Sequence, residues 1–164
     1  MELRPARPDD LERLREIEVA AGTLFEGTVH AEVAAHAAPP VEELAGAAAI
    51  IVAVDGDDRP VGYARIELVG GGAHLEQLSV DPAAGRAGVG TALLDAVSAW
   101  SADHGDGAVT LTTFRAVPFN QPYYERRGYV TLDDAALPPA LRALVAEEAH
   151  RGLDPATRVV MRRG

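Results

Sequence analysis

Hydrophobic residues alternate with polar ones along some stretches of this chain and recur every three or four residues along others, and these two periods distinguish strands from helices. Alternating or uniformly apolar stretches predict strands at residues 2–6, 48–55, 61–69, 73–80, 108–114, 128–132 and 158–162. Helical spacing predicts helices at residues 9 or 10 to 21, 89–104, 122–127 and 137–150, the first capped by Asp9 or Asp10. The segment 25–46 fits one or two short helices, with breaks at Gly27 and Pro39-Pro40. This order of elements predicts an α/β fold with a mixed sheet flanked by helices.

A glycine-rich loop joins the strand at 73–80 to the helix at 89–104 and has the sequence DPAAGRAGVG from Asp81 to Gly90. Gly88 and Gly90 let the main chain approach a ligand with no Cβ in the way. The first N–H groups of the helix and the positive end of its dipole point at the same place, so the loop is a candidate site for a pyrophosphate. The chain contains no lysine, which excludes a Walker-type loop, and the spacing does not match the G-x-G-x-x-G dinucleotide fingerprint.

This loop resembles the acyl-CoA loop of the GNAT N-acetyltransferase superfamily, whose pattern is Q/R-x-x-G-x-G/A. Gly85 stands where that pattern has Gln or Arg, and Arg86 directly after it can supply the missing charge. A second segment resembles the later motif of the superfamily, with Asn120 before a short helix and the signature YERRGY at residues 124–129. Together with TTFR at residues 112–115, these motifs are similar to those of a bacterial GNAT subgroup. The resemblance covers most of the chain and is weakest between residues 25 and 47.

The resemblance implies a GNAT acyl-CoA N-acyltransferase fold, with a central, mostly antiparallel mixed sheet of about seven strands, as a single domain over residues 1–164. It implies an enzyme that moves an acetyl group from acetyl-CoA to a primary amine. Because the chain has no cysteine to carry an acyl group, direct transfer in a ternary complex is expected. The alternative is a non-catalytic acyl-CoA sensor or interaction module of the same fold, and a longer acyl-CoA donor is a further alternative.

The same resemblance assigns residues that would bind CoA. The main chain of Leu78 would meet the acetyl oxygen and that of Val80 the pantetheine arm, and Asn120 would contact CoA. The loop residues that would bind the pyrophosphate are Arg86, Ala87, Gly88, Val89, Gly90 and Thr91. Tyr124 falls on the tyrosine that protonates the departing thiolate. The alternatives are a core tyrosine at 124 and a plain helix cap at Asn120.

A base is also required, because a free aliphatic amine has a pKa near 10. Strand alternation places His74, Glu76 and Leu78 on one face and Gln77 and Ser79 on the other. The resemblance implies that the base lies on this strand, so we expect Glu76 to act directly or through water, with His74 as a relay. The alternatives are an ion pair between Glu76 and an arginine such as Arg115, and a surface position for His74 on an edge strand.

The acceptor is the least defined part of the prediction. Residues 1–60 carry 13 acidic and 5 basic side chains, and the whole chain has a net charge of −10. This excess favours a small cationic acceptor such as a polyamine, an amino sugar or a basic amino acid, although a solvated acidic surface explains it equally well. Candidates for lining the acceptor site are Phe25, Glu26, His30, Glu32 and Arg115, the last with a structural role as the alternative.

Composition excludes several other classes. The negative charge argues against nucleic acid, and no apolar run is as long as a membrane span. The absence of cysteine excludes a disulfide framework and thiol catalysis and fits a cytoplasmic protein. No metal is expected as a cofactor. Proteins of this fold often pair through their sheets or C-terminal elements, so a homodimer is a candidate assembly.

Overall fold

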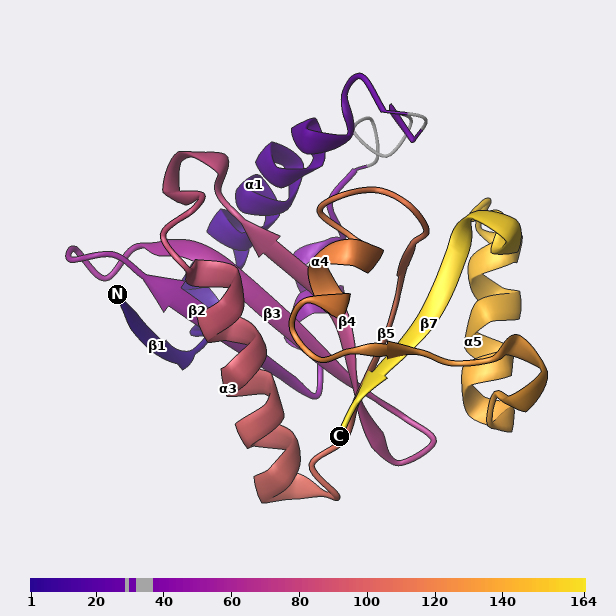
Figure 1. The fold of residues 1–164 in the computed structure, drawn as a ribbon. Helices are drawn as coiled ribbons and strands as arrows, with labels where there is room; N and C mark the ends of the chain where they lie inside the picture. The colour runs from indigo at the N-terminus through magenta and orange to yellow at the C-terminus, as the bar shows by residue number, and fades with distance from the viewer. Residues whose placement is uncertain (29, 32–36) are drawn as a thin grey trace. The chain divides into compact units, whose positions relative to one another are not determined.

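The computed structural model describes residues 1–28, 30–31 and 37–164, and it contains one seven-stranded sheet with strand order β1-β2-β3-β4-β5-β7-β6 (Figure 1). The strands are β1 Glu2–Pro5, β2 Ala49–Val54, β3 Pro60–Val69, β4 Gly72–Val80, β5 Val109–Phe114, β6 Val130–Thr131 and β7 Arg158–Arg163. The α-helices in the described residues are α1 Leu11–Gly22, α2 Val41–Ala45, α3 Val89–His104, α4 Gln121–Glu125 and α5 Pro139–His150. Strand β4 pairs in parallel with β5, whereas β1–β2, β2–β3, β5–β7 and β6–β7 pair antiparallel. The predicted mixed sheet flanked by helices is confirmed.

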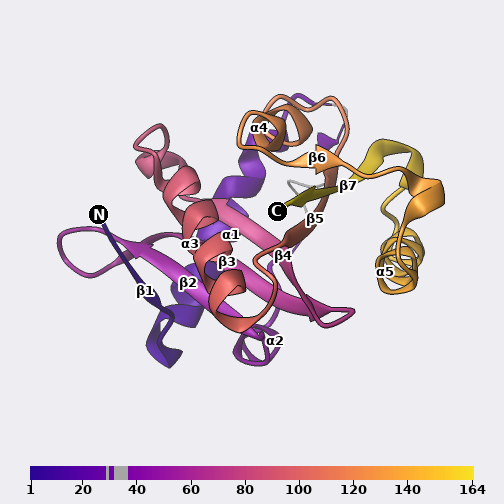
Figure 2. The same ribbon diagram turned by 60° about the horizontal axis from the view of Figure 1, so that its bottom comes forward.

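The chain forms two compact units, Met1–Glu67 with Gln77–Val97 and Leu68–Glu76 with Ser98–Gly164. In the first unit, helices α1 and α2 pack on one face of β2 and β3. The buried residues of this core are Leu11, Leu14, Ile17, Leu44, Ile50, Val52, Val54 and Tyr63. The first turns of α3 lie against the other face, where Gly62 gives them room (Figure 2). A Cβ on Gly62 would lie 2.9 Å from Cγ1 of Val89 and 3.4 Å from Leu93. Glycine at this position therefore allows the close approach of helix and strand.

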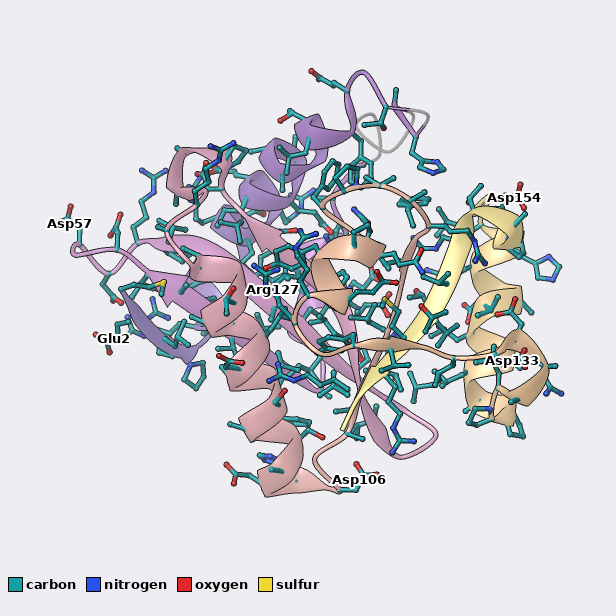
Figure 3. The ribbon with its side chains drawn as sticks, in the orientation of Figure 1. Glu2, Asp57, Asp106, Arg127, Asp133 and Asp154 are labelled. Carbon is teal, nitrogen blue, oxygen red and sulfur yellow. The ribbon has the colours of Figure 1, made fainter. Side chains whose placement is uncertain are left out.

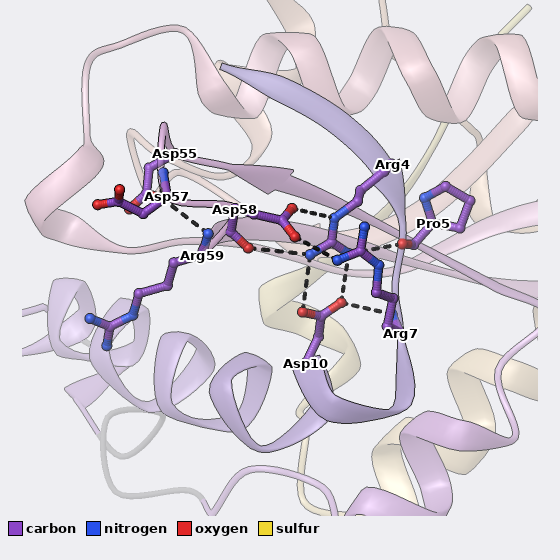
Figure 4. A network of polar contacts seen from close by, with 8 residues as sticks. All are labelled: Arg4, Pro5, Arg7, Asp10, Asp55, Asp57, Asp58 and Arg59. Carbon is purple, nitrogen blue, oxygen red and sulfur yellow. Dashed lines mark hydrogen bonds and ion pairs between the residues drawn. The ribbon is translucent and has the colours of Figure 1, made fainter.

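An ion-pair network joins the hairpin turn between β2 and β3 to the first strand (Figure 4). Arg4 lies between two carboxylates, with Nη1 2.7 Å from Asp10 and Nε 2.8 Å from Asp58. Arg7 pairs with the same Asp58. The side chains of Arg4 and Asp10 are each only 10% exposed. The hydrogen bond from Arg4 holds the pKa of Asp10 below its usual value, so this carboxylate stays ionised.

In the second unit, α5 covers β7 through a small apolar core. Its buried residues are Leu137, Leu141 and Val160, and Val69, Leu132, Leu144 and Val145 pack around them. Two aspartates labelled in Figure 3 shape the turns on either side of α5. Asp133 accepts a hydrogen bond from the N–H of Ala135, and Asp154 accepts one from the N–H of Ala156, each at 3.0 Å.

Two sequence predictions need correction. The carboxylate of Asp10 does not cap α1, because it accepts from the N–H of Arg7 at 2.7 Å and from Arg4. Strand β6 is only two residues long, Val130–Thr131, because Gly128 before it takes a left-handed φ of 86°. In the segment 25–46, the described residues contain a short helix, as expected: α2 begins at Val41, directly after Pro39-Pro40, and Phe25 ends a 3-10 turn at Thr23–Phe25.

Candidate active site

The glycine-rich loop leaves β4 at Val80, makes a 3-10 turn at Pro82–Ala84 and enters α3 at Val89. Residues 85–88 are exposed, and Arg86 and Gly88 have left-handed φ values of 67° and 77°. A backbone that alternates between the two hands turns successive N–H groups to one side and forms a concave anion-binding nest. The start of α3 adds its own N–H groups and dipole. The local structure therefore has the features that a phosphate group requires.

Gly85 is the point at which the loop departs from the family pattern, and the structure gives a steric reason for it. A Cβ on Gly85 would lie 3.1 Å from the carbonyl oxygen of Pro82, which also accepts the N–H of Gly85. Any residue other than glycine would therefore require this carbonyl to shift by a few tenths of an ångström. Arg86, in the next position, is exposed and able to offer its guanidinium to an anion.

His74 and Glu76 lie on one face of β4, as the alternation predicts. Nε2 of His74 is 3.9 Å from Oε2 of Glu76, and Nδ1 is 2.8 Å from Oγ1 of Thr110 on β5. His74 is 1% exposed on a strand inside the sheet, so the alternative of a surface histidine on an edge strand is wrong. Burial lowers the pKa of His74 to about 4, and the ring is neutral at neutral pH. The Glu76 side chain is 32% exposed and accessible to water.

A buried polar cluster on the same unit was missed by the sequence analysis. Glu148 of α5 accepts from Oγ1 of Thr112 at 2.8 Å and from Nη2 of Arg158 at 3.0 Å. Arg158 also donates to Thr112 at 3.0 Å and lies over the ring of Phe114. The charges of Glu148 and Arg158 act in opposite directions on the pKa of His74.

One signal in the sequence could have found this cluster. Glu148 follows Leu141, Leu144 and Val145 at helical spacing, so it lies on the apolar face of α5. A carboxylate in that position needs a buried cationic partner.

Tyr124 lies in α4 within a group of aromatic side chains. Its ring packs edge-on against Tyr123 and Tyr129, with ring centroids 5.2 and 5.6 Å apart. Burial raises the pKa of the Tyr124 phenol above its usual value, so the hydroxyl stays protonated. Arg127, labelled beside α4 in Figure 3, lies over the ring of Tyr123 at 3.5 Å. Tyr124 can therefore donate a hydrogen bond but cannot act as a base at neutral pH.

Asn120 precedes α4 but does not cap it with its side chain. Its Oδ1 accepts from Oγ1 of Thr113 on β5 at 2.8 Å, and the residue is buried. The main-chain oxygen of Asn120 accepts the N–H of Tyr124 at 3.0 Å. Asn120 therefore stands at the N-cap position, as the alternative of a plain helix cap expects, but its side chain makes no capping hydrogen bond.

The expected acceptor residues are found in two places. Phe25 and Glu26 lie at the end of a 3-10 turn, and the buried His30 donates its N–H to Oγ1 of Thr28 at 3.1 Å. Glu32 lies outside the described residues. Arg115 donates to the carbonyl oxygen of Arg158 at 3.1 Å. This contact fits the alternative in which Arg115 has a structural role.

In the described parts of the chain, no three histidine, cysteine, aspartate or glutamate side chains are grouped so that they could hold a metal ion. Within these same ranges, no helix combines the length and apolar character that crossing a membrane requires.

Solved structures of known proteins share this fold. An acetyltransferase of the GNAT family from Staphylococcus aureus Mu50 matches with a TM-score of 0.73 at 14% identity, over 99% of this chain and 97% of that chain. PaiA N-acetyltransferase from Thermoplasma acidophilum, solved in complex with coenzyme A, matches with a TM-score of 0.67 at 15% identity, over 99% of this chain and 97% of that chain. Aminoglycoside 6′-acetyltransferase type Ii matches with a TM-score of 0.67 at 22% identity, over 99% of this chain and 96% of that chain. The fold is therefore that of acetyltransferases.

The sequence match is more specific. The sequence model of the Acetyltransferase (GNAT) family matches residues 11–129, and the chain belongs to that family. It is an N-acetyltransferase, and the resemblance found in its two motifs is confirmed.

Proposed function

We propose that the protein transfers the acetyl group of acetyl-CoA to the primary amine of a small, cationic acceptor by direct attack in a ternary complex. The observation that carries this proposal is the loop at residues 85–88, whose left-handed Arg86 and Gly88 form an exposed nest at the start of α3. That arrangement suits the pyrophosphate of CoA. Membership of the GNAT family makes acyl transfer the reaction that such a site serves.

Donor binding would use the main chain more than side chains. The N–H groups of residues 86–91 would hold the pyrophosphate, with Arg86 adding a charge. The main chain of Leu78 and Val80, at the end of β4, would hold the acetyl oxygen and the pantetheine arm. The bond from Thr113 engages Oδ1 of Asn120, and the amide nitrogen of the same side chain would be a further donor to CoA.

The amine must lose a proton before it can attack. We propose that Glu76 takes this proton, directly or through water, because its carboxylate is partly exposed and shares a face with His74. His74, neutral and fixed by Thr110, would orient Glu76 and relay the proton. In the transfer, the C–N bond forms, the C–S bond breaks and the CoA sulfur leaves as a thiolate.

Tyr124 would stabilise that thiolate by donating its hydroxyl hydrogen to the sulfur. Its raised pKa supports this role, since the phenol stays protonated and has a hydrogen to donate. The proton taken from the amine balances the one that the thiol finally carries. No covalent acyl-enzyme is required, in keeping with a chain that contains no cysteine.

The acceptor proposal depends on charge. The acidic excess in residues 1–60 would attract a cation, and Phe25, Glu26, His30 and Arg115 are the proposed lining residues. Aminoglycoside 6′-acetyltransferase type Ii, one of the proteins with the same fold, is named for an aminoglycoside acceptor, which supports an amino sugar as one candidate here.

The test is the release of CoA thiol from acetyl-CoA with a panel of amines and a blank without amine. The panel contains polyamines, aminoglycosides, amino acids, short peptides and arylalkylamines. Saturable release with a cationic class supports the proposal, whereas release only with neutral or acidic amines overturns the acceptor class. Tight binding of acetyl-CoA without release from any amine would favour the non-catalytic sensor.

A further inference from the structure

Arg13 of α1 contacts Asp81, which follows β4 at the start of the glycine-rich loop. Nη2 of Arg13 lies 2.5 Å from Oδ2 of Asp81, and the two side chains are only 20% and 19% exposed. The two residues are 68 positions apart in the chain. Asp81 is the first residue of the glycine-rich loop and Arg13 lies outside it, and neither is among the groups that take part in the proposed chemistry.

Asp81 is bound on every polar side. Its Oδ1 accepts the N–H of Ala83 in the turn that starts the loop at 3.0 Å, and its own N–H donates to the carbonyl of Val61 at 2.8 Å. Arg13 donates through Nε to the carbonyl of Pro60 at 3.2 Å. The start of the loop is therefore tied to α1 and to the first residues of β3.

The far end of the loop rests on the same part of β3. Val89, the first residue of α3, is buried against Gly62, where even a Cβ would come within 2.9 Å of its side chain. Both ends of the loop are thus fixed on Pro60–Gly62, while residues 85–88 between them stay exposed. A loop with fixed ends has less conformational freedom to lose when a ligand binds.

We propose that Arg13 and Asp81 are positioning residues for the acyl donor, which hold the loop in its anion-binding conformation before acetyl-CoA arrives. The proposal rests on the proposed function of the loop as the donor site. The pair contacts no reacting atom, so its loss would weaken donor binding and leave the chemical step of the bound complex unchanged.

The experiment compares Arg13→Gln, Asp81→Asn and the double variant with the unaltered chain. We expect each single variant to bind acetyl-CoA about tenfold more weakly by calorimetry, with KM for acetyl-CoA raised to match and kcat within about twofold, because a largely buried charged hydrogen bond is lost. The double variant should bind no more weakly than the weaker single one, since the two changes remove the same interaction.

Arg15→Gln is the matched control on the same helix. Arg15 donates to a main-chain carbonyl, that of Pro39 at 2.9 Å, and pairs with Glu12 at 3.0 Å. Arg13 does the same with Pro60 and with Glu16 at 3.1 Å, so the extra contact with Asp81 is what distinguishes it. Arg15→Gln should leave the acetyl-CoA affinity unchanged.

Hydrogen exchange without ligand gives an independent result. The amides of residues 83–88 should exchange faster in Arg13→Gln than in Arg15→Gln. Unchanged affinity and exchange in the Arg13 and Asp81 variants would overturn the inference while leaving the proposed function intact. If the unaltered chain failed to bind acetyl-CoA, the proposed function itself would fall. Should Arg13→Gln not fold, Arg13→Lys takes its place, because lysine keeps the charge opposite Asp81 but lacks the guanidinium that also donates to Pro60. Its acetyl-CoA affinity should fall by less than about tenfold, and an unchanged affinity would overturn the inference.

Discussion

Tyr124 and Tyr123 are neighbours in α4 with different expected roles. Tyr124→Phe should lower kcat about 10- to 100-fold, with KM for acetyl-CoA within about twofold, because the lost hydrogen bond forms only as the thiolate develops. Tyr123→Phe, which removes the same hydroxyl from the partner ring of the edge-on pair, is the control and should retain activity. Steady-state kinetics of thiol release measures both. Unchanged turnover in Tyr124→Phe would remove this residue as the proton donor.

His74 makes the stability of the fold depend on pH. Its pKa falls from 6.5 to about 4 in the folded protein, so the unfolded chain binds more protons between these values. The contribution of the neutral His74 to the free energy of unfolding should therefore be fully present above pH 6.5 and decrease as the pH falls toward 4. Between pH 7 and 4.5 the loss due to this group is about 2.5 kcal/mol. Urea unfolding at both pH values should show a smaller loss in His74→Gln, and equal losses would show that the ring is not held neutral.

At single positions, the sequence predicted which side chains share a face of an element better than it predicted which residues they contact. The shared face of His74 and Glu76 followed from strand alternation alone. The partner of Asn120 did not, because Thr113 lies on β5 while Asn120 precedes α4, and a hydroxyl gives no periodic signal. Asp10 likewise was expected at a helix start, and Arg4 draws its carboxylate elsewhere.

Among the elements, α5 carries a contrast between adjacent glutamates. The Glu148 side chain is 11% exposed and pairs with the buried Arg158, whereas Glu147 is 68% exposed and faces Arg151 at 3.7 Å. Glu148→Ala should destabilise the fold by about 3 kcal/mol, because it leaves a buried guanidinium without its carboxylate. Glu147→Ala should change stability by less than about 0.5 kcal/mol. Chemical denaturation of both variants measures the difference, and equal effects would show that the Glu148 pair is not buried in solution.

Element boundaries were predictable where two signals coincide. Helix α3 begins at Val89 and ends at His104, as expected, because Gly88 and Gly105 bracket an apolar face that contains Leu93, Leu94 and Val97. Strand β6 was overestimated because its β-branched residues satisfy the strand pattern, while Gly128 turns the chain just before it.

For the whole molecule, charge is the property that bears on the acceptor. If the acidic residues of 1–60 attract a cationic amine, KM for that amine should rise severalfold between about 10 mM and 300 mM salt, because the Debye length shrinks from about 30 Å to a few Å. The KM for a neutral amine of the same size should change much less. Equal salt dependence for the two amines would assign the acidic excess to an ordinary solvated surface.

The sheet as a whole was predictable because seven patterned segments and two motifs agree. The expectation of a single domain over residues 1–164 stays a prediction. Contacts such as that between Arg13 and Asp81 were not predictable, because charged residues 68 positions apart leave no mark on local periodicity. The acceptor segment was the least certain region, since its residues follow neither the helical nor the strand period.

Helix α5 and strand β7 follow residue 129, where the match to the family model ends. Nevertheless, Glu148 and Arg158 in these elements act on the titration of His74 in β4. Replacing residues 130–164 with those of a relative that lacks Glu148 or Arg158 would therefore change the acidity at which the histidine ring takes up a proton. The residues that fix the donor loop, from Arg13 to Val89, would be inherited unaltered. Tolerance of acid and affinity for the donor can thus diverge separately among related enzymes.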